Sequence, residues 1–335
     1  MSEASNTEEI IEDVAYSDKS SRNVLNVCVI DKEPALKKLW VIYIHGGAWR
    51  DPRINASSFN KTQSLILNSG IRSQLSGLAS IDYRLSPHPD FPQDHPDYPS
   101  DPAHPSQNAH HPDHINDILT AISYLQTTYR FTSNYILAGH SCGATLALQV
   151  AMSRTWTTTG PSPNPSSPDT PLPFSPISVL GLEGIYDLPA LIAHNASIPI
   201  YEEFTLGAFG PRHLSPGPGL QPVDVWTAVS PTSGDYSPTT WPEGRYVLIA
   251  HSHEDEQVEW DQVELIERTF KHRGYGQWVK KKGNYSGRMG DRRFETMELM
   301  GKHHEVWEEG KEVKRAIERA VLRTCQLPEM RDGVV

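Results

Sequence analysis

The short pattern with the clearest chemistry is GHSCG at residues 139–143, a G-x-S-x-G sequence centred on Ser141. It directly follows the apolar run Tyr135–Ala138 and precedes an alanine-rich segment, ATLALQVAM. A strand, a tight turn and a helix in this order hold a serine hydroxyl at the edge of a sheet, with the helix N-terminus facing any negative charge that develops beside it. Ser141 is therefore the predicted nucleophile. Its neighbour Cys142 is expected to pack in the turn and to lend its backbone amide.

A second pattern, HGGAW, follows the apolar run Leu39–Ile44. Because glycine leaves backbone amides unobstructed, the N–H groups of Gly47 and Ala48 are predicted to join that of Cys142 around an oxyanion. Donors of this kind stabilise a transition state by roughly 3–4 kcal/mol each. The predicted oxyanion motif comprises His45, Gly46, Gly47, Ala48 and Trp49, with Cys142 from the nucleophile turn.

A serine nucleophile needs a histidine base, and the base needs a carboxylate that orients it. In hydrolases with the G-x-S-x-G turn, the acid follows the serine along the chain and the histidine comes last. Three acidic residues, Glu254, Asp255 and Glu256, follow the apolar run Tyr246–Ala250. Asp255 is the preferred acid because its short side chain suits a fixed position in a loop.

Two adjacent histidines, His303 and His304, lie further along in GKHHEVWEEG. Neighbouring side chains point in different directions, so only one of them can serve as the base, and these residues alone leave the choice open. His251 and His253 are expected to be loop residues without a catalytic role.

The elements that must position these residues alternate along the chain. Apolar runs too short for helices are expected to form strands, namely Leu25–Ile30, Leu39–Ile44, Leu78–Tyr83, Tyr135–Ala138, Val179–Leu182, Tyr246–Ala250 and Gln277–Lys281. Helical periodicity marks Asp113–Tyr129, Gln257–His272 and Glu305–Thr324. This alternation predicts an α/β fold with a mostly parallel central sheet and helices on both faces. Asp82 and Arg84, at the end of one expected strand, should tie neighbouring loops together.

The domain organisation follows from composition along the chain. Residues 1–20 are acidic and polar, and we expect a flexible tail there. Residues 21–335 are expected to form one domain. Two proline-rich segments, at about 87–112 and 155–176, interrupt the pattern. Because proline lacks the N–H that a helix interior or central strand requires, both are predicted to be surface insertions.

The overall composition excludes several classes of function. The 335-residue chain has 30 Lys and Arg against 41 Asp and Glu, a net charge of −11, which speaks against nucleic-acid binding. Three widely spaced cysteines predict neither a disulfide framework nor a zinc site. No run approaches the roughly 20 apolar residues of a membrane span. With no basic, apolar start of the kind that secretion requires, a cytoplasmic protein is expected.

Histidine is unevenly distributed, and this raises the alternative of a metal-dependent hydrolase. Six of the 15 histidines fall between residues 88 and 114, namely His88, His95, His104, His110, His111 and His114. They are interleaved with proline and lack a convergent spacing such as H-E-x-x-H, so we expect no specific metal site and no cofactor.

The motifs HGGAW, DYRLS, GHSCGA and HHEVW occur in this order, and the chain thereby resembles the esterase/lipase branch of the α/β-hydrolase superfamily. HGGAWRDP at residues 45–52 and EGIYDL at residues 183–188 resemble, more narrowly, the fungal kynurenine formamidases. The acid of that family lies in an HS-x-x-D element, which matches Asp255 here. Its base lies in a G-x-H-x-[DE]-V-[WY] element, and this match selects His303 over His304.

The resemblance implies a serine hydrolase that cleaves a linear amide, N-formyl-L-kynurenine, to L-kynurenine and formate in tryptophan degradation toward NAD. It implies a Ser-Asp-His triad, a formyl-enzyme and no cofactor, and a homodimer is compatible with it. Because a formyl group is small, recognition should come from the aromatic ring and the amino-acid end. Trp49, Tyr186 and Trp307 are the expected ring contacts. The alternatives are a broad short-chain carboxylesterase of the same fold and an inactive hydrolase fold used for binding.

Overall fold

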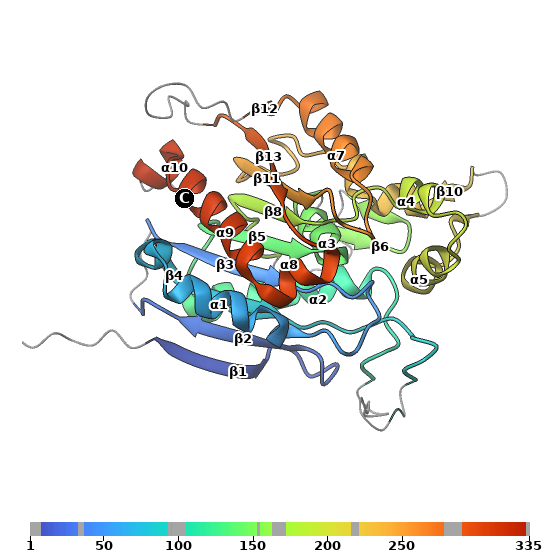
Figure 1. Cartoon of the computed structure of the whole chain (residues 1–335), viewed down its shortest axis with the longest axis horizontal. Helices are drawn as coiled ribbons and strands as arrows, with labels where there is room; N and C mark the ends of the chain where they lie inside the picture. Colours follow the sequence, from blue (N-terminus) through green and yellow to red (C-terminus); the bar gives the residue numbers. More distant parts are fainter. Residues whose placement is uncertain are drawn as a thin grey trace, which may run out of the picture.

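The computed structural model describes residues 8–32, 37–92, 95, 105–152, 155–162, 172–215, 221–277 and 290–332. Its central sheet contains β1 (Glu9–Ala15), β2 (Val24–Val29), β3 (Leu39–Ile44), β4 (Leu75–Ile81), β5 (Tyr135–His140), β8 (Ser178–Leu182), β11 (Tyr246–Ser252), β12 (Gly276–Gln277) and β13 (Arg293–Leu299). Their order is β1-β2-β4-β3-β5-β8-β11-β13-β12 (Figure 1). β2 is antiparallel to both of its neighbours, and the pairs from β4 through to β12 are parallel.

The central strands are apolar throughout because helices cover both of their faces. Every residue of β3, LWVIYI, is buried, as is every residue of β4, β5, β8 and β11. The helices are α1 (Asn60–Leu67), α2 (Asp113–Tyr129), α3 (Cys142–Met152), α4 (Leu188–His194), α5 (Ile200–Phe209), α6 (Val225–Val229), α7 (Asp261–His272), α8 (His303–Glu309), α9 (Lys311–Thr324) and α10 (Pro328–Asp332).

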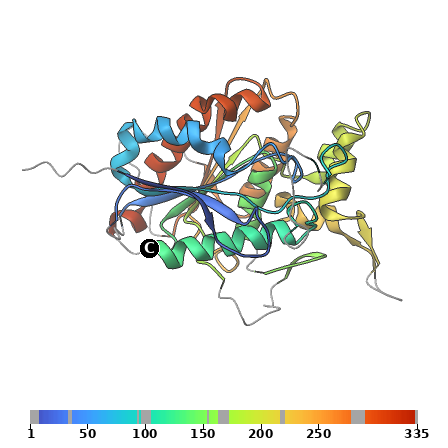
Figure 2. The same cartoon turned by 90° about the horizontal axis from the view of Figure 1, so that it is seen from below.

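Two apolar clusters lie on the two faces of the sheet. One includes the buried sides of α2, α3 and α7, and the other those of α1, α8 and α9 (Figure 2). On α2 the predicted face is confirmed, because Ile115, Ile118, Ile122 and Leu125 are fully buried. The predicted fold, a mostly parallel sheet with helices on both sides, is confirmed. None of the helices in the described ranges is long and apolar enough to cross a membrane.

The remaining small elements extend this core. Two short hairpins pair β6 (Thr155–Thr157) with β7 (Gly160–Ser162) and β9 (His213–Leu214) with β10 (Val223–Asp224). Single turns of 3-10 helix occur at Ala56–Phe59, Gly70–Gln74 and Pro231–Ser233. α4 and α5 project beyond the sheet as a separate pair (Figures 1 and 2).

The expectation of a flexible tail over residues 1–20 is wrong for its described part. Glu9–Ala15 forms β1, which pairs antiparallel with β2 at the sheet edge. Most of its residues are exposed, so its polar, acidic composition resembles that of a tail although its backbone is hydrogen-bonded. Residues 1–7 lie outside the described ranges.

Two expected helices and one strand also differ. The helix expected over 305–324 is interrupted at Gly310, whose φ of 72° separates α8 from α9. The helix expected from residue 257 begins at Asp261. β13 was not predicted, because charged residues alternate along RFETMEL; one of them, Glu295, pairs with Arg319 and Arg323. Residues 278–281 of the last expected strand lie outside the described ranges.

The two proline-rich segments are more closely packed than surface insertions need be. Near the end of the first, Ala109 is fully buried and its N–H donates to the carbonyl of Leu85, while the Leu85 N–H donates to that of Ser106. The second contributes the β6–β7 hairpin. Residues 93–94 and 96–104 of the first segment and 163–171 of the second lie outside the described ranges.

Candidate active site

The site forms where the parallel strands end. β3, β4, β5, β8, β11 and β13 are followed by His45, Asp82, Ser141, Glu183, Asp255 and His303. In parallel α/β sheets the carboxyl ends of the strands share one edge, and ligands bind there. The topology therefore brings together residues that are far apart in the sequence.

Ser141 lies in a tight turn between β5 and α3, as predicted. Its φ of 55° falls in the left-handed region that side chains rarely adopt, which is the strained geometry of a nucleophile turn. The two flanking glycines permit this turn. A Cβ on Gly139 would lie 2.1 Å from the Gly143 carbonyl oxygen, and one on Gly143 would lie 2.3 Å from that of Ile44. The Ser141 N–H donates to the Leu182 carbonyl at 2.8 Å, which attaches the turn to β8.

The HGGAW loop packs directly against this turn. A Cβ on Gly46 would lie 2.9 Å from His140 Nδ1 and 3.1 Å from the Ser141 Cβ. Gly47, Ala48 and Trp49 all have positive φ, at 99°, 50° and 61°. Gly47 and Ala48 line the same cavity as Ser141, where an oxyanion would form.

Cys142 occupies the space behind this loop. The Trp49 N–H donates to its sulfur at 3.3 Å, and the Ala48 amide is a further partner of the thiol. Of the predicted oxyanion donors, the amides of Ala48 and of Cys142 itself therefore have the thiol as a competing acceptor. Burial raises the pKa of the Cys142 thiol to about 11, so it is neutral at physiological pH and unsuited to act as a nucleophile.

The HGGAW loop is held in place by ion pairs and ring stacking at His45. His45 Nε2 lies 3.1 Å from Asp82 Oδ1, which also accepts a 2.7 Å hydrogen bond from Arg22. The His45 ring stacks on Tyr83 with centroids 4.4 Å apart. Asp82 thus joins two loops, as predicted. Arg84 differs from the prediction, because its guanidinium forms two hydrogen bonds with Asp117 of α2 and so ties the segment after β4 to a helix.

Asp255 and His303 are brought into direct contact. His303 Nδ1 lies 2.8 Å from Asp255 Oδ2, and both side chains are almost completely buried. The second carboxylate oxygen, Oδ1, accepts the N–H groups of Gln257 and Val258 at 2.8 and 2.9 Å. The other candidate base, His304, is 45% exposed and lies nearest to Glu308. The geometry therefore pairs His303 with a buried acid, whereas the acid beside His304 is exposed.

These contacts keep Asp255 ionised. Burial alone would raise its pKa, but the hydrogen bond and charge attraction of His303, together with His251 and the Val258 N–H, lower the pKa below its usual value. His251 was expected in a loop. It lies instead in β11, fully buried, with Nε2 2.8 Å from the Val258 carbonyl and 3.4 Å from Asp255 Oδ2.

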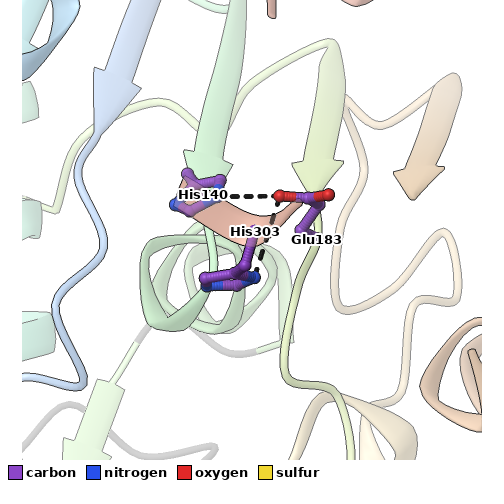
Figure 3. A group of neighbouring side chains, drawn as sticks. All are labelled: His140, Glu183 and His303. Atoms are coloured by element: carbon purple, nitrogen blue, oxygen red, sulfur yellow. Dashed lines mark hydrogen bonds and ion pairs between the residues drawn. The ribbon is translucent and has the colours of Figure 1, made fainter. Parts of the chain in front are cut away.

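A third acid, which the motif analysis did not single out as a site residue, lies beside the pair. Glu183 Oε2 is 3.2 Å from His140 Nε2 and 3.7 Å from His303 Nδ1 (Figure 3). One ligand atom from each of these residues lies within 4.8 Å of the others, a spacing that also suits a metal ion. His303 Nδ1 is already hydrogen-bonded to Asp255, so we interpret the group as a hydrogen-bonded cluster.

A cavity of about 400 Å³ opens beside Ser141 and His303. Besides these two residues, its wall includes His140, Gly47, Ala48, Ile185, Ile198, Ile200, Tyr201, Phe204, Gln257, Val258, His304 and Trp307, with Arg50, Asp51, Arg53, Ile54 and His88. The volume is in the range of sites for small organic ligands. Most of the apolar wall comes from Ile185 and from the segment that holds α4 and α5.

Of the three predicted ring contacts, only Trp307 lies on this wall. Trp49 and Tyr186 are fully buried in the core, so their prediction as ring contacts is wrong. Trp49 packs edge-on against Phe209 instead, with centroids 5.0 Å apart. The Trp49 amide, in contrast, is part of the loop beside the nucleophile.

Two features of the cavity wall were not predicted: an apolar cap, formed by Ile198, Ile200, Tyr201 and Phe204, and the charged residue Arg50. Ile198 and Ile200 lie about half exposed, where a loop or helix normally carries polar residues. That pattern, in SIPIYEEF, is the available indication of a cap. In the sequence, Arg50 is notable only as part of the HGGAWRDP segment that resembles the fungal family. Its side chain is buried on the cavity wall and forms a 2.7 Å ion pair with Glu203 of α5.

Comparisons with known proteins identify the family of the chain. Residues 41–178 match a family described as having the alpha/beta hydrolase fold. The kynurenine formamidase-like hydrolase fscH of Fusarium equiseti is 35% identical over 84% of this chain and 82% of its own length. Kynurenine formamidase avaC of Aspergillus versicolor is 31% identical over 75% of this chain and 84% of its own.

Solved structures share the fold at low sequence identity. Esterase B from Lactobacillus rhamnosis superposes with a TM-score of 0.61 at 14% identity, over 97% of this chain and 90% of that chain. An esterase from Thermogutta terrifontis does so with a TM-score of 0.55 at 14% identity, over 98% and 97%. These likenesses support the fold, while the closer relatives define the family. The chain belongs to the kynurenine formamidase family of α/β hydrolases.

Proposed function

We propose that this enzyme hydrolyses N-formyl-L-kynurenine to L-kynurenine and formate with Ser141, His303 and Asp255 as a catalytic triad. The observation that carries the proposal is that one cavity wall holds both Ser141 and His303, with Asp255 hydrogen-bonded behind the imidazole. The relatives named kynurenine formamidase supply the substrate.

In the proposed reaction these groups act in the following steps. Ser141 Oγ attacks the formyl carbon, and its proton passes to His303 Nε2 while Nδ1–H remains bonded to Asp255. Amides of Gly47, Ala48 and Cys142 stabilise the oxyanion. The C–N bond then breaks, and His303 returns the proton to the leaving aniline nitrogen. Water, deprotonated by His303, hydrolyses the formyl ester on Ser141 and releases formate.

Substrate recognition is assigned to two parts of the cavity. The isoleucines Ile185, Ile198 and Ile200, with Trp307, offer an apolar surface for the aromatic ring. Arg50 offers a buried guanidinium, which suits a carboxylate through charge-assisted hydrogen bonds. Its ion-pair partner Glu203 is half exposed and can meet an ammonium group. A zwitterionic amino-acid end therefore matches the Arg50–Glu203 pair.

The deciding experiment compares kcat/KM for N-formylkynurenine with that for p-nitrophenyl acetate on purified protein. We expect a clear preference for the formamide, and loss of about 10⁶-fold in kcat in Ser141→Ala. Preference for the ester would favour a broad carboxylesterase instead. Undiminished activity in Ser141→Ala would refute the triad, and loss of activity on EDTA treatment with recovery on zinc addition would favour metal-dependent hydrolysis.

A further inference from the structure

Glu183 is a buried acid that the triad mechanism does not use. It directly follows β8, is fully buried, and has a φ of 46°, in the left-handed region that costs energy for any residue other than glycine. Its N–H donates to the Ala250 carbonyl at 2.8 Å, which ties this strained residue to β11. Strain of this kind persists where the surrounding structure enforces it, often at functional sites.

The side chain reaches two imidazoles at once. Oε2 lies 3.2 Å from His140 Nε2 and 3.7 Å from His303 Nδ1, while Oε1 has no hydrogen-bond partner among the described residues. The two rings themselves are in contact, with centroids 4.7 Å apart (Figure 3). The His303 backbone is a further hydrogen-bond partner of the His140 ring. Glu183, His140 and His303 thus form one packed unit behind Ser141.

The charges around this unit decide its protonation. Burial and the nearby carboxylates of Asp255, Glu256 and Glu312 raise the pKa of Glu183 to about 10. Burial and the other imidazoles lower the pKa of His140 well below its usual value. His251, His304, Tyr43 and Tyr186 are the other titratable groups facing the unit. The raised pKa of Glu183 and the lowered pKa of His140 agree, because both favour a neutral acid next to a neutral imidazole.

We propose that Glu183 is a positioning residue for the base: as a neutral acid it donates its O–H to His140 Nε2, and the pair fixes the His303 ring without adding a second negative charge beside it. This inference rests on the proposed role of His303. An ionised Glu183 would place a second negative charge beside the Asp255–His303 pair, and a nearby negative charge favours the cationic form of an imidazole. A neutral Glu183 adds no such charge.

The test uses two substitutions at this position and one control. Glu183→Leu removes the donor while filling the space, and we expect kcat to fall about a hundredfold, as for other small misplacements of a catalytic group. KM should change little. Glu183→Gln keeps an uncharged donor to His140. It should therefore retain most of the wild-type kcat, and the acidic limb of its kcat/KM pH profile should lie at the same pH as in the wild type. Glu312→Gln, which removes a neighbouring charge without touching the imidazoles, is the control.

Two results would overturn the proposal. If Glu183→Gln is as impaired as Glu183→Leu and its acidic limb moves to lower pH, an ionised Glu183 is required. If Glu183→Leu lowers Tm but keeps kcat, the residue is merely structural. Infrared difference spectra of wild type against Glu183→Gln report the protonated carboxyl directly. All variants are assayed with both N-formylkynurenine and p-nitrophenyl acetate, because the position of His303 matters for either reaction. If the wild type hydrolyses only the ester, the proposed substrate is refuted. The kcat values of the Glu183 variants on the ester then still test this inference.

Discussion

His303 Nδ1 lies 2.8 Å from Asp255 Oδ2, although 48 positions separate the two residues along the chain. The carboxylate holds the ring through Nδ1, which leaves Nε2 as the atom able to exchange a proton with Ser141. The adjacent His304 is 45% exposed, with Glu308 as its nearest acid. This difference between neighbouring residues leads to the first prediction.

Replacing the acid by its amide should disable the base without removing it. Asp255→Asn is expected to lower kcat by about 10⁴-fold, because the amide favours the wrong imidazole tautomer. His303→Ala should be at least as impaired, whereas His304→Ala should change mainly KM, since His304 lines the cavity without an orienting acid. Steady-state kinetics on the formamide measure all three. Equal losses of kcat in His303→Ala and His304→Ala would contradict the assignment.

The close contact between the two loops beside Ser141 gives a second prediction. Gly46→Ala would place a Cβ 2.9 Å from His140 Nδ1, so the HGGAW loop must move away from the nucleophile turn. A displacement near 1 Å costs about 10²-fold in rate. Gly70→Ala is the matched control, because nothing lies within 4 Å of its added Cβ. Similar kcat values for the two variants would show that the loop can adapt.

Recognition of the amino-acid end can be tested with a substrate that lacks it. Arg50→Gln is expected to raise KM for N-formylkynurenine, since hydrogen bonds between charged groups contribute about 1.5–3 kcal/mol each. The same variant should leave KM for 2-formamidoacetophenone, which keeps the ring and formamide, close to the wild-type value. Arg53→Gln is a useful comparison, because Arg53 is more exposed and pairs with Asp51. Equal KM changes on both substrates would assign Arg50 a structural role.

Glu183 should also affect stability in a pH-dependent way. Its pKa is raised from 4.5 to about 10 in the folded protein, so its contribution is most favourable below about pH 4.5 and is lost as the pH rises toward 10. Each pH unit in that interval costs about 1.4 kcal/mol, on the order of 4 kcal/mol between pH 5 and pH 8. Glu183→Gln avoids this cost.

Urea denaturation of both proteins at pH 5 and pH 8 measures the effect. The difference in the free energy of unfolding between Glu183→Gln and wild type should grow in favour of the variant as the pH rises. Comparing the two proteins cancels the contribution of other titrating groups. A difference that is the same at both pH values would show that Glu183 is already ionised.

Local patterns in the sequence were sufficient for the nucleophile turn and the class of fold. GHSCG after one apolar run and HGGAW after another predict a serine at the edge of a parallel sheet, because the glycines and the strand–turn–helix order act within a few residues. They were not sufficient for the choice between His303 and His304, which rested on family resemblance until the structure showed which ring meets Asp255.

Other features depend on contacts between distant segments, and no local pattern encodes them. β1 has a polar composition because it is an exposed edge strand, and only its pairing with β2 distinguishes it from a tail. Trp49 belongs to the HGGAW loop, yet its ring is buried in the core while its amide lies beside Cys142. The sequence by itself determined the α/β architecture and the turn that holds Ser141 at the end of β5. Only the tertiary structure decided which residues surround the cavity, because the ends of six parallel strands and the α4–α5 pair meet at one edge of the sheet.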